Sequence, residues 1–368
     1  MLDHRWQFKL RYLLPADKTL IVKGPAVLAF VSGEASVLGA PLSRSDHIVI
    51  RQEKQVPVEA KSETNIELKV GVGGEITEID GSSLPKSWKA AAESLGAMTN
   101  GIAIIIGPTE VGKSALCTYI LNQLLDTRTR VQIIDADIGQ ADIGPPTTIA
   151  SSIPYRPVPS LTELIPERII FVGHTSPSTV QSKVINGIKR MITDSKALVI
   201  INTDGWTLEP EAIRYKINLI SAIKPESIVA IGPAVALRPI LDAAQTMCIS
   251  AEASQAILPR SRNDRKRLRE AAYQRFLQGS TTQTLPIHNL RIQLRASIQE
   301  SFIRREPKLN NTLVGLLDEE SYLHQIGVLT RISENTVQLY SRSTHNMTTL
   351  EVGYVKLSTN GQELGYLD

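Results

Sequence analysis

The stretch Gly107-Pro-Thr-Glu-Val-Gly-Lys-Ser114 constrains the fold more than any other part of the chain. It lies between the all-apolar run at residues 102–106 and a segment with the apolar spacing of a helix, which starts at Leu116. A glycine-rich turn between a buried strand and a helix directs backbone N–H groups toward a phosphate, and the helix N-terminus adds partial positive charge. The stretch therefore predicts a phosphate-binding loop (P-loop), with Lys113 on the β- and γ-phosphates and the Ser114 hydroxyl on Mg²⁺.

The pattern around this loop predicts a nucleotide-binding α/β domain. Short apolar runs alternate with segments of helical period, which is typical of a parallel sheet covered by helices on both faces. These runs are residues 102–106, 131–134, 169–172, 198–201 and 228–231. Residues 145–166 contain six prolines, so we expect a long loop near the carboxyl edge of the sheet and neither a regular helix nor a central strand.

The sequence on both sides of this domain predicts β structure. Between about residues 18 and 80, and again after residue 286, short apolar runs are separated by turn residues. Residues 88–95 have helical spacing and form an expected connector. The sequence predicts an N-terminal β-rich domain at 1–82, a P-loop domain at 83–285 and a C-terminal β-rich domain at 286–368.

Composition limits the cellular setting. A net charge of +3 in 368 residues gives no globally cationic surface, so a nucleic-acid site must be a local patch. With only two cysteines, Cys117 and Cys248, a disulfide framework is excluded, and we expect an intracellular, cytoplasmic protein in a reducing compartment. Residues 1–9 carry charges where a signal peptide needs an apolar stretch, and no apolar run reaches the roughly 18 residues of a membrane span.

Two further motifs follow strands of the predicted sheet. In Asp135-Ala-Asp137-Ile-Gly-Gln140 the carboxylates lie at the sheet edge that carries the P-loop, where an Asp binds metal, accepts a proton or only caps a turn. In Asn202-Thr-Asp-Gly-Trp206 the ring of Trp206 is either packing or a stacking platform for a base. Neither this strand end nor the one after residues 228–231 has the Asn-Lys-x-Asp typical of guanine readers, which argues against a GTPase.

A basic run occupies residues 259–269 and contains one acid, Asp264. Such a run is usually a solvated face. After the last strand of a P-loop domain, however, it also fits a lid whose arginines close over the γ-phosphate. The basic residues are Arg260, Arg262, Arg265, Lys266, Arg267 and Arg269.

Taken in order, these motifs resemble the polynucleotide 5′-hydroxyl-kinase family of the pre-mRNA cleavage and tRNA-splicing complexes. The shared pattern is the P-loop at 107–114, Asp-x-Gly-Gln at 137–140, Thr-x-Gly-Trp at 203–206 and Arg-x-x-x-Arg at 265–269. Likeness extends to Ser-Gly-Glu-Ala-Ser-Val-Leu-Gly at 32–39 and Gly-Leu-Leu-Asp-Glu-Glu at 315–320, and the compact length is typical of archaeal members.

This resemblance implies a central P-loop NTPase-type parallel sheet with helices on both faces, flanked by N-terminal and C-terminal β-rich domains. It implies transfer of the ATP γ-phosphate to the 5′-hydroxyl of RNA, with DNA as a further acceptor. Its ATP-binding residues would be Gly107, Pro108, Thr109, Glu110, Val111, Gly112, Lys113, Ser114 and Ala115.

The resemblance also implies a role for each remaining site residue. Asp137 would be the general base and, with Ser114, a Mg²⁺ ligand, while Lys113, Arg265 and Arg269 would stabilise the transferring phosphoryl group. The first nucleotides of the acceptor would contact Gln140, Thr175, Thr203 and Trp206. The position of Asp135 is Glu in some relatives, which leaves its role open.

Two other functions use the same core. A small-molecule kinase or GTPase would not need Trp206 beside the site, and excess oligonucleotide would leave its activity unchanged. A catalytically silent ATP-binding scaffold in an RNA-processing complex would not need Asp137 together with Arg265 and Arg269.

Overall fold

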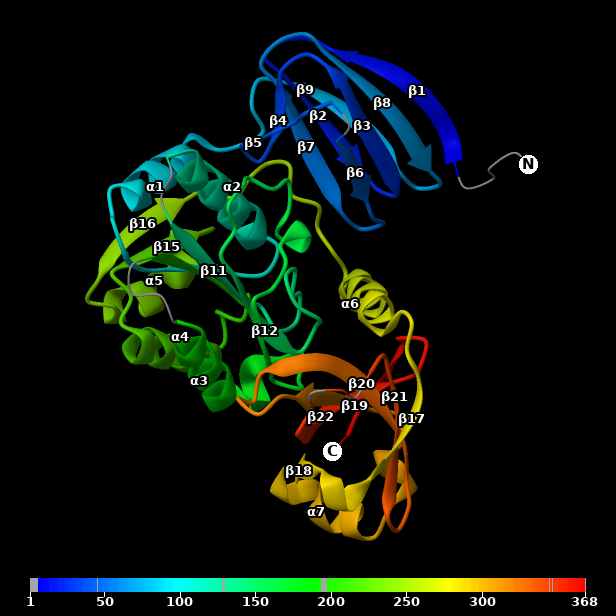
Figure 1. Cartoon of the computed structure of the whole chain (residues 1–368). Helices are drawn as coiled ribbons and strands as arrows, with labels where there is room; N and C mark the ends of the chain where they lie inside the picture. Colours follow the sequence, from blue (N-terminus) through cyan, green and yellow to red (C-terminus); the bar gives the residue numbers. More distant parts are fainter. Residues whose placement is uncertain are drawn as a thin grey trace. The chain divides into compact units, whose positions relative to one another are not determined.

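The computed structural model describes residues 6–44, 46–127, 130–192, 197–343, 345 and 347–367 (Figure 1). Residues 1–5 of the charged N-terminal segment lie outside these ranges. The chain divides into two compact units. Unit 1 comprises Met1–Ile133, Ile153–Leu164 and Asp194–Asp264, and unit 2 comprises Ile134–Ser152, Ile165–Thr193 and Arg265–Asp368. The division into three domains that the sequence predicts stays a prediction beside these two units.

The described residues between 6 and 80 form antiparallel sheets with strand orders β1-β8-β3-β6 and β5-β4-β7-β2-β9, as the short apolar runs predict. In β8, the side chains of Ile66, Leu68 and Val70 are buried, and the polar residues between them are exposed, because successive side chains of a strand point to opposite faces. The strands are β1 (Trp6–Leu14), β2 (Lys18–Lys23), β3 (Ala26–Ser32), β4 (Ala35–Val37), β5 (Ala40–Pro41), β6 (His47–Ile50), β7 (Gln55–Ala60), β8 (Thr64–Gly71) and β9 (Glu75–Asp80).

The central sheet has the strand order β13-β12-β11-β14-β10-β15-β16. Parallel pairing joins β10 to β14 and β15, and β15 to β16, which confirms the P-loop type of sheet. In unit 1, α1 and α2 lie on one side of β10, β15 and β16, and α4 and α5 lie on the other (Figure 1). These elements are α1 (Lys86–Gly96), β10 (Gly101–Ile106), α2 (Lys113–Asp126), β11 (Val131–Ala136), β14 (Leu198–Thr203), α4 (Pro210–Ile223), β15 (Ser227–Ile231), α5 (Ala234–Ala243) and β16 (Met247–Ala251).

The expectation for residues 145–166 was wrong in part. β12 (Thr148–Ser152) lies inside the sheet, where it pairs antiparallel with β13 (Arg168–Phe171), so the sheet is mixed. The six prolines all lie outside residues 148–152, so every residue of this short segment keeps its backbone N–H and can pair on both sides. Short 3₁₀ turns follow at Leu161–Glu163 and Pro177–Thr179, and then α3 (Gln181–Met191).

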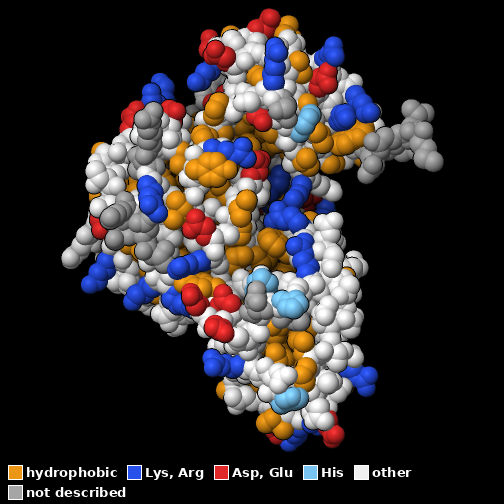
Figure 2. Space-filling view, viewed as in Figure 1, with side chains coloured by type: hydrophobic (Ala, Val, Ile, Leu, Met, Phe, Trp, Pro, Cys, Tyr) orange, Lys and Arg blue, Asp and Glu red, His pale blue; other side chains and the backbone are white. Residues whose placement is uncertain are grey.

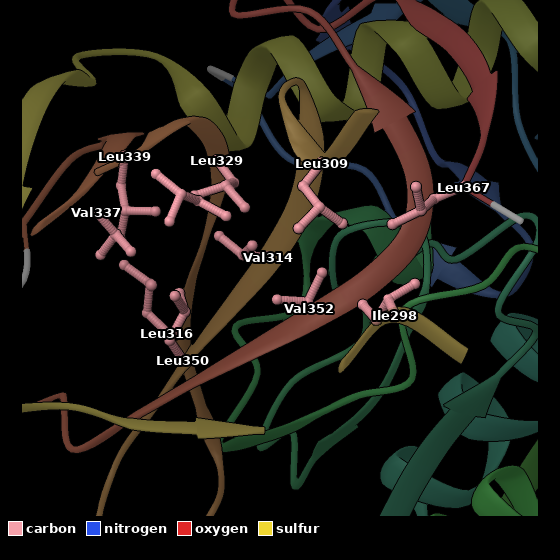
Figure 3. Close-up of a cluster of buried hydrophobic side chains, with 11 residues drawn as sticks. Ile298, Leu309, Val314, Leu316, Leu329, Val337, Leu339, Leu350, Val352 and Leu367 are labelled. Carbon is pink, nitrogen blue, oxygen red and sulfur yellow. The ribbon is translucent and has the colours of Figure 1, made fainter. Parts of the chain in front are cut away.

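The C-terminal sheet has the order β17-β21-β20-β19-β22-β18, with β23 paired to β22, and it confirms the β-rich C-terminal region. Its inner face forms an apolar core that includes Val314, Leu329, Val352 and Leu367 (Figure 3). The elements from α6 onward are α6 (Arg262–Leu277), β17 (Thr281–Pro286), β18 (Arg291–Gln293), α7 (Ala296–Ile303), β19 (Thr312–Leu317), β20 (Leu323–Ile332), β21 (Thr336–Ser341), β22 (Thr349–Leu357) and β23 (Glu363–Tyr366), with 3₁₀ turns at Ile287–Asn289 and Pro307–Leu309.

Phe171 at the end of β13 explains why unit 2 joins part of the central sheet to this C-terminal sheet. Its ring is buried in a second apolar core with Leu313, Val355 and Tyr273. At Gly315 the ring of Phe171 comes so close that an added Cβ would lie 2.6 Å from its Cγ. One continuous core therefore spans β13, α6 and the C-terminal strands.

No helix in the described part of the chain is long and apolar enough to span a membrane.

Asn122 of α2 ties the P-loop helix to two loops of unit 1. Its buried side chain donates from Nδ2 to the carbonyls of Leu38 and Val158, both at 2.8 Å, and its Oδ1 accepts the Val158 N–H at 2.9 Å. Buried backbone groups that lose such a partner cost about 1–3 kcal/mol each.

We expect Asn122→Ala to lower the free energy of unfolding by about 2–4 kcal/mol, since three backbone groups lose their partner. Urea unfolding followed by circular dichroism measures it. Gln123→Ala, at the partly buried next position of α2, is the control and should cost less than about 1 kcal/mol. Equal losses in the two variants would contradict the role of Asn122.

Candidate active site

The P-loop of unit 1 has the backbone geometry that its sequence predicts. At Gly107 a Cβ would lie 2.3 Å from the carbonyl oxygen of Ile231, so only glycine fits between β10 and β15. Gly112 has φ +93°, a left-handed conformation that other residues rarely adopt, and it leads directly into α2. The buried Lys113 donates from Nζ to the Pro108 carbonyl at 2.8 Å, so its ammonium group lies over the loop.

Ser114 is connected to the end of β14. Its Oγ accepts a hydrogen bond from Nδ2 of the buried Asn202 at 3.3 Å. This bond fixes the hydroxyl in the first turn of α2, where the helix N-terminus and Lys113 surround it. A hydroxyl held in this way is an oxygen ligand of the kind that Mg²⁺ takes in P-loop proteins.

The loop after β14 packs directly on the P-loop. A Cβ at Gly205 would lie 2.6 Å from the backbone nitrogen of Thr109, so the two backbones touch only because residue 205 is glycine. Thr203 is buried, and its hydroxyl donates to the Ile105 carbonyl at 2.8 Å, which joins β14 to β10. In this structure the Thr203 hydroxyl is bonded within the sheet. Its contact with nucleic acid stays a prediction.

A buried ion pair holds the backbone at Trp206. The carboxylate of Asp204 accepts the Trp206 N–H at 3.0 Å and binds Nζ of Lys216 at 2.9 Å, and the Lys216 side chain is 0% exposed. Tyr215 donates its hydroxyl to the same carboxylate at 3.2 Å and lies 5.9 Å from the Trp206 ring, centroid to centroid. Because Trp206 is only partly buried, it packs on Tyr215 and still offers aromatic surface. Packing and base stacking are therefore compatible.

Lys216→Met should lower the free energy of unfolding by about 3–5 kcal/mol, because it leaves the Asp204 carboxylate buried without its cation. Urea unfolding followed by tryptophan fluorescence measures the loss. The double variant Asp204→Asn/Lys216→Met removes the stranded charge and should be more stable than the single variant. Lys224→Met, which removes an exposed lysine at the end of α4, is the control. An equal decrease in its free energy of unfolding would show that the buried ion pair does not contribute specifically to stability.

In unit 2, Asp135 organises the loop after β11. It is completely buried, and its Oδ2 accepts the backbone N–H groups of Asp142 at 2.6 Å and Ile143 at 3.1 Å. Burial, with the nearby carboxylates of Asp142 and Asp137, raises its pKa to about 7, while the two backbone bonds act in the opposite direction. Of the roles that the sequence left open for Asp135, this geometry matches the turn cap.

Asp137 lies at the more accessible end of the same loop. Its Oδ1 accepts the N–H groups of Gly139 at 3.2 Å and Gln140 at 3.0 Å, which fixes the carboxylate relative to the loop. At Gly139 a Cβ would lie 2.7 Å from the Thr175 carbonyl, and Gln140 donates from Nε2 to the Arg265 carbonyl at 3.4 Å. The structure therefore brings Asp137, Gln140, Thr175 and the start of α6 together.

Most of the basic run is helical. Because α6 begins at Arg262, Arg265 and Arg269 lie one turn apart on this helix, while Arg260 precedes it. Lys and Arg side chains gather over α6 (Figure 2). Arg269, however, forms a bidentate ion pair with Glu363 of β23, with Nε–Oε1 at 2.6 Å and Nη2–Oε2 at 2.8 Å. Their side chains are only 15% and 8% exposed. The guanidinium fork that the sequence predicts for a phosphoryl group is here bound to a carboxylate of the C-terminal sheet.

Several residues of the site were missed by the sequence reasoning. Asn202 stood in a quoted motif without a role. A signal for Lys216 was available, because it occupies the apolar face of α4 with Ala212, Tyr215 and Leu219. No local pattern indicated Glu363, which lies 94 positions from its partner Arg269.

Comparison with known proteins identifies the P-loop region. Residues 107–279 match the family model described as the mRNA cleavage and polyadenylation factor CLP1 P-loop. This region of similarity to CLP1 (the CLP1-type region) contains the P-loop, Asp137, Trp206 and all of α6.

Most of the chain resembles archaeal proteins, and its fold is similar to that of a solved complex. The polyribonucleotide 5′-hydroxyl-kinase of Pyrococcus horikoshii is 25% identical over 342 residues, covering 78% of this chain and 94% of that protein. The enzyme of the same name from Methanocaldococcus jannaschii is 24% identical over 323 residues, covering 72% and 89%. The wild-type Clp1p–Pcf11p complex matches with a TM-score of 0.72 at 11% identity, covering 95% of this chain and 98% of that chain, which shows a shared fold.

Proposed function

We propose that this chain is an ATP-dependent polynucleotide 5′-hydroxyl kinase that transfers the γ-phosphate of ATP to the 5′-hydroxyl of RNA, with DNA as a further acceptor. The observation that carries the proposal is the contact of Gly205 with Thr109, which fixes the Trp206 loop against the P-loop. A kinase for small acceptors needs no aromatic base platform beside its phosphate loop. The names of the curated relatives support RNA as the acceptor.

The P-loop residues 107–115 bind the donor. Backbone N–H groups of the loop and of the first turn of α2 surround the phosphates, and Lys113 moves its ammonium group from the Pro108 carbonyl to the β- and γ-phosphates. Lys113 then opposes negative charge where it grows in the transition state.

The oxygen donors of this chain fit Mg²⁺, which accompanies ATP. A Mg²⁺ ion bound mainly by substrate phosphates needs only one or two protein oxygens, and the Ser114 hydroxyl and the Asp137 carboxylate are of that kind. When bound, the ion would neutralise charge on the phosphate oxygens.

On the acceptor side, Asp137 accepts the proton of the 5′-hydroxyl, and its Oδ1 bonds to two backbone N–H groups keep the carboxylate oriented for this step. Trp206 stacks on a base of the acceptor, while Gln140, Thr175 and Thr203 position its first nucleotides. Arg265 and Arg269 stabilise the phosphoryl group in transit, and for this Arg269 must exchange Glu363 for phosphate oxygens.

Incubation of the purified chain with labelled ATP, Mg²⁺ and a 5′-hydroxyl RNA tests the proposal. We expect labelled 5′-phosphate on the RNA, no transfer after chelation of Mg²⁺, and loss of at least about a hundredfold in turnover for Lys113→Ala. Asp137→Asn should lose transfer and still bind ATP, because it keeps the size of the side chain and loses the basic oxygen.

Two results would contradict these assignments. ATP binding without transfer to RNA or DNA of any length would favour the scaffold. Transfer to a small molecule that excess oligonucleotide does not inhibit would favour the small-molecule kinase.

Arginine-to-lysine variants along α6 separate a lid from a basic patch. A lid needs the guanidinium fork, so Arg265→Lys and Arg269→Lys should lower turnover at saturating substrates by about tenfold or more. In a passive patch, the residues are interchangeable and act through RNA affinity and its salt dependence. The exposed Arg262 and Arg267 are the matched controls, and we expect less than about a twofold change for Arg262→Lys and Arg267→Lys.

Glu363→Gln then distinguishes the two roles of Arg269. If Arg269 acts on the phosphoryl group, freeing it from Glu363 should maintain or raise turnover. If Arg269 only anchors α6 to β23, Glu363→Gln should reproduce the defect of Arg269→Lys, and the proposed catalytic role would be wrong.

A further inference from the structure

A layered aromatic stack in unit 2 ends at the exposed ring of Tyr366. The imidazole of His174 stacks on Tyr366, with centroids 5.1 Å apart and the planes at 28°. Tyr354 meets His174 edge-on at 5.1 Å, and the guanidinium group of Arg295 lies 3.8 Å from the Tyr354 ring centroid. Tyr366 is 48% exposed. Because His174 covers one face of its ring, the exposed surface is on the other face and the edges.

The backbone that follows this ring is firmly held. The next residue, Leu367, is buried in the core of the C-terminal sheet (Figure 3). Its N–H donates to the Tyr354 carbonyl at 2.6 Å, and its carbonyl accepts from Nη2 of Arg295 at 2.7 Å. A ring fixed in this way loses little conformational entropy when a flat ligand stacks on it.

Neighbouring groups indicate which flat ligand this is. The Tyr366 hydroxyl is hydrogen-bonded to Oγ1 of Thr175, and the Thr175 carbonyl lies against Gly139 of the Asp137 loop. The one carboxylate of β23, Glu363, lies three residues before Tyr366 and is paired with Arg269 of α6. Cations and hydroxyl groups around an exposed aromatic ring suit a base attached to a phosphate backbone better than an apolar peptide.

The imidazole of His174 contributes to the stack in its neutral form. Burial lowers the pKa of His174; the hydrogen bond with Ser176 acts in the opposite direction, and the positive charge of Arg295 acts in the same direction as burial. Its Nδ1 accepts the Ser176 N–H at 2.9 Å, which an unprotonated nitrogen can do.

We propose that Tyr366, backed by His174, is a stacking platform for a base of the single-stranded acceptor, supplied by the C-terminal sheet in addition to Trp206. The inference rests on the proposed kinase function, because the acceptor is what brings a base to Thr175. The platform reads no base identity, since every base offers a π face.

Equilibrium binding without ATP tests the platform independently of catalysis. The probe is a 3′-fluorescein 5′-hydroxyl hexaribonucleotide, followed by fluorescence anisotropy. Tyr366→Ala should weaken its binding between about fivefold and 150-fold, the range that corresponds to loss of one base–aromatic stack. Tyr366→Phe keeps the ring, loses only the bond to Thr175 and should stay within about threefold of the unmodified chain.

Two further variants are controls for this binding measurement. Tyr366→Leu keeps apolar cover over His174 and should show the same loss as Tyr366→Ala, so a folding defect peculiar to alanine is recognised. Tyr155→Ala removes another tyrosine, 89% exposed in unit 1, and should bind the hexamer as the unmodified chain does. Thermal melting of each variant confirms that it is folded.

Hexamers with one abasic nucleotide locate the stacked base. At one position of the hexamer, removal of the base should weaken binding to the unmodified chain. The unmodified chain and Tyr366→Ala should then bind this abasic hexamer with the same affinity. The proposal is wrong if Tyr366→Ala and Tyr366→Leu bind as tightly as the unmodified chain. It is equally wrong if Tyr366→Phe loses as much as Tyr366→Ala, or if the defect persists at every abasic position.

Phosphate transfer by the unmodified chain separates this inference from the proposed function. If the unmodified chain phosphorylates the hexamer and Tyr366→Ala does so with an unchanged Michaelis constant, only the platform fails. If the unmodified chain binds the hexamer through Tyr366 and transfers no phosphate, the kinase function fails and the binding site remains.

Discussion

The close approach of backbones around the P-loop is the constraint on which the rest of unit 1 depends. Gly107 lies against the Ile231 carbonyl and Gly205 lies against the backbone nitrogen of Thr109, both at distances that leave no room for a Cβ. These contacts bring the ends of β10, β14 and β15 to one place. Because β14 is held there, Asn202 reaches Ser114 and the loop that follows carries Trp206.

In each unit, a buried ionisable side chain fixes the conformation of a loop. Lys216 and Asp204 form a pair that holds the N–H of Trp206, and Asp135 accepts two N–H groups of the loop that starts at Asp137. Burying such groups is costly unless they are paired, so each fixes one loop conformation. The residues that we place at the substrate are thus held by residues that do not touch it.

The C-terminal sheet supplies residues that contact the CLP1-type region. Its strand β23 binds Arg269 of α6 through Glu363 and presents Tyr366 beside Thr175. Both residues lie beyond residue 279, where the match to the family model ends. A role for this sheet in acceptor binding would give the kinase region a longer contact with a polynucleotide than its P-loop domain alone provides.

The sequence by itself determined the P-loop, the central sheet and its β-rich flanks, because each depends on the local spacing of glycine and apolar residues. It located the basic run, but only the structure showed that most of this run is helical. It failed at β12, a five-residue strand that the flanking prolines obscured and that pairs with β13. The sequence reasoning also missed Lys216, although that residue lies only 12 positions from Asp204, and it left the role of Asp135 open. It could not find Glu363 and Tyr366, because they meet Arg269 and Thr175 across 94 and 191 positions of the chain, and only the tertiary structure brings such distant segments together.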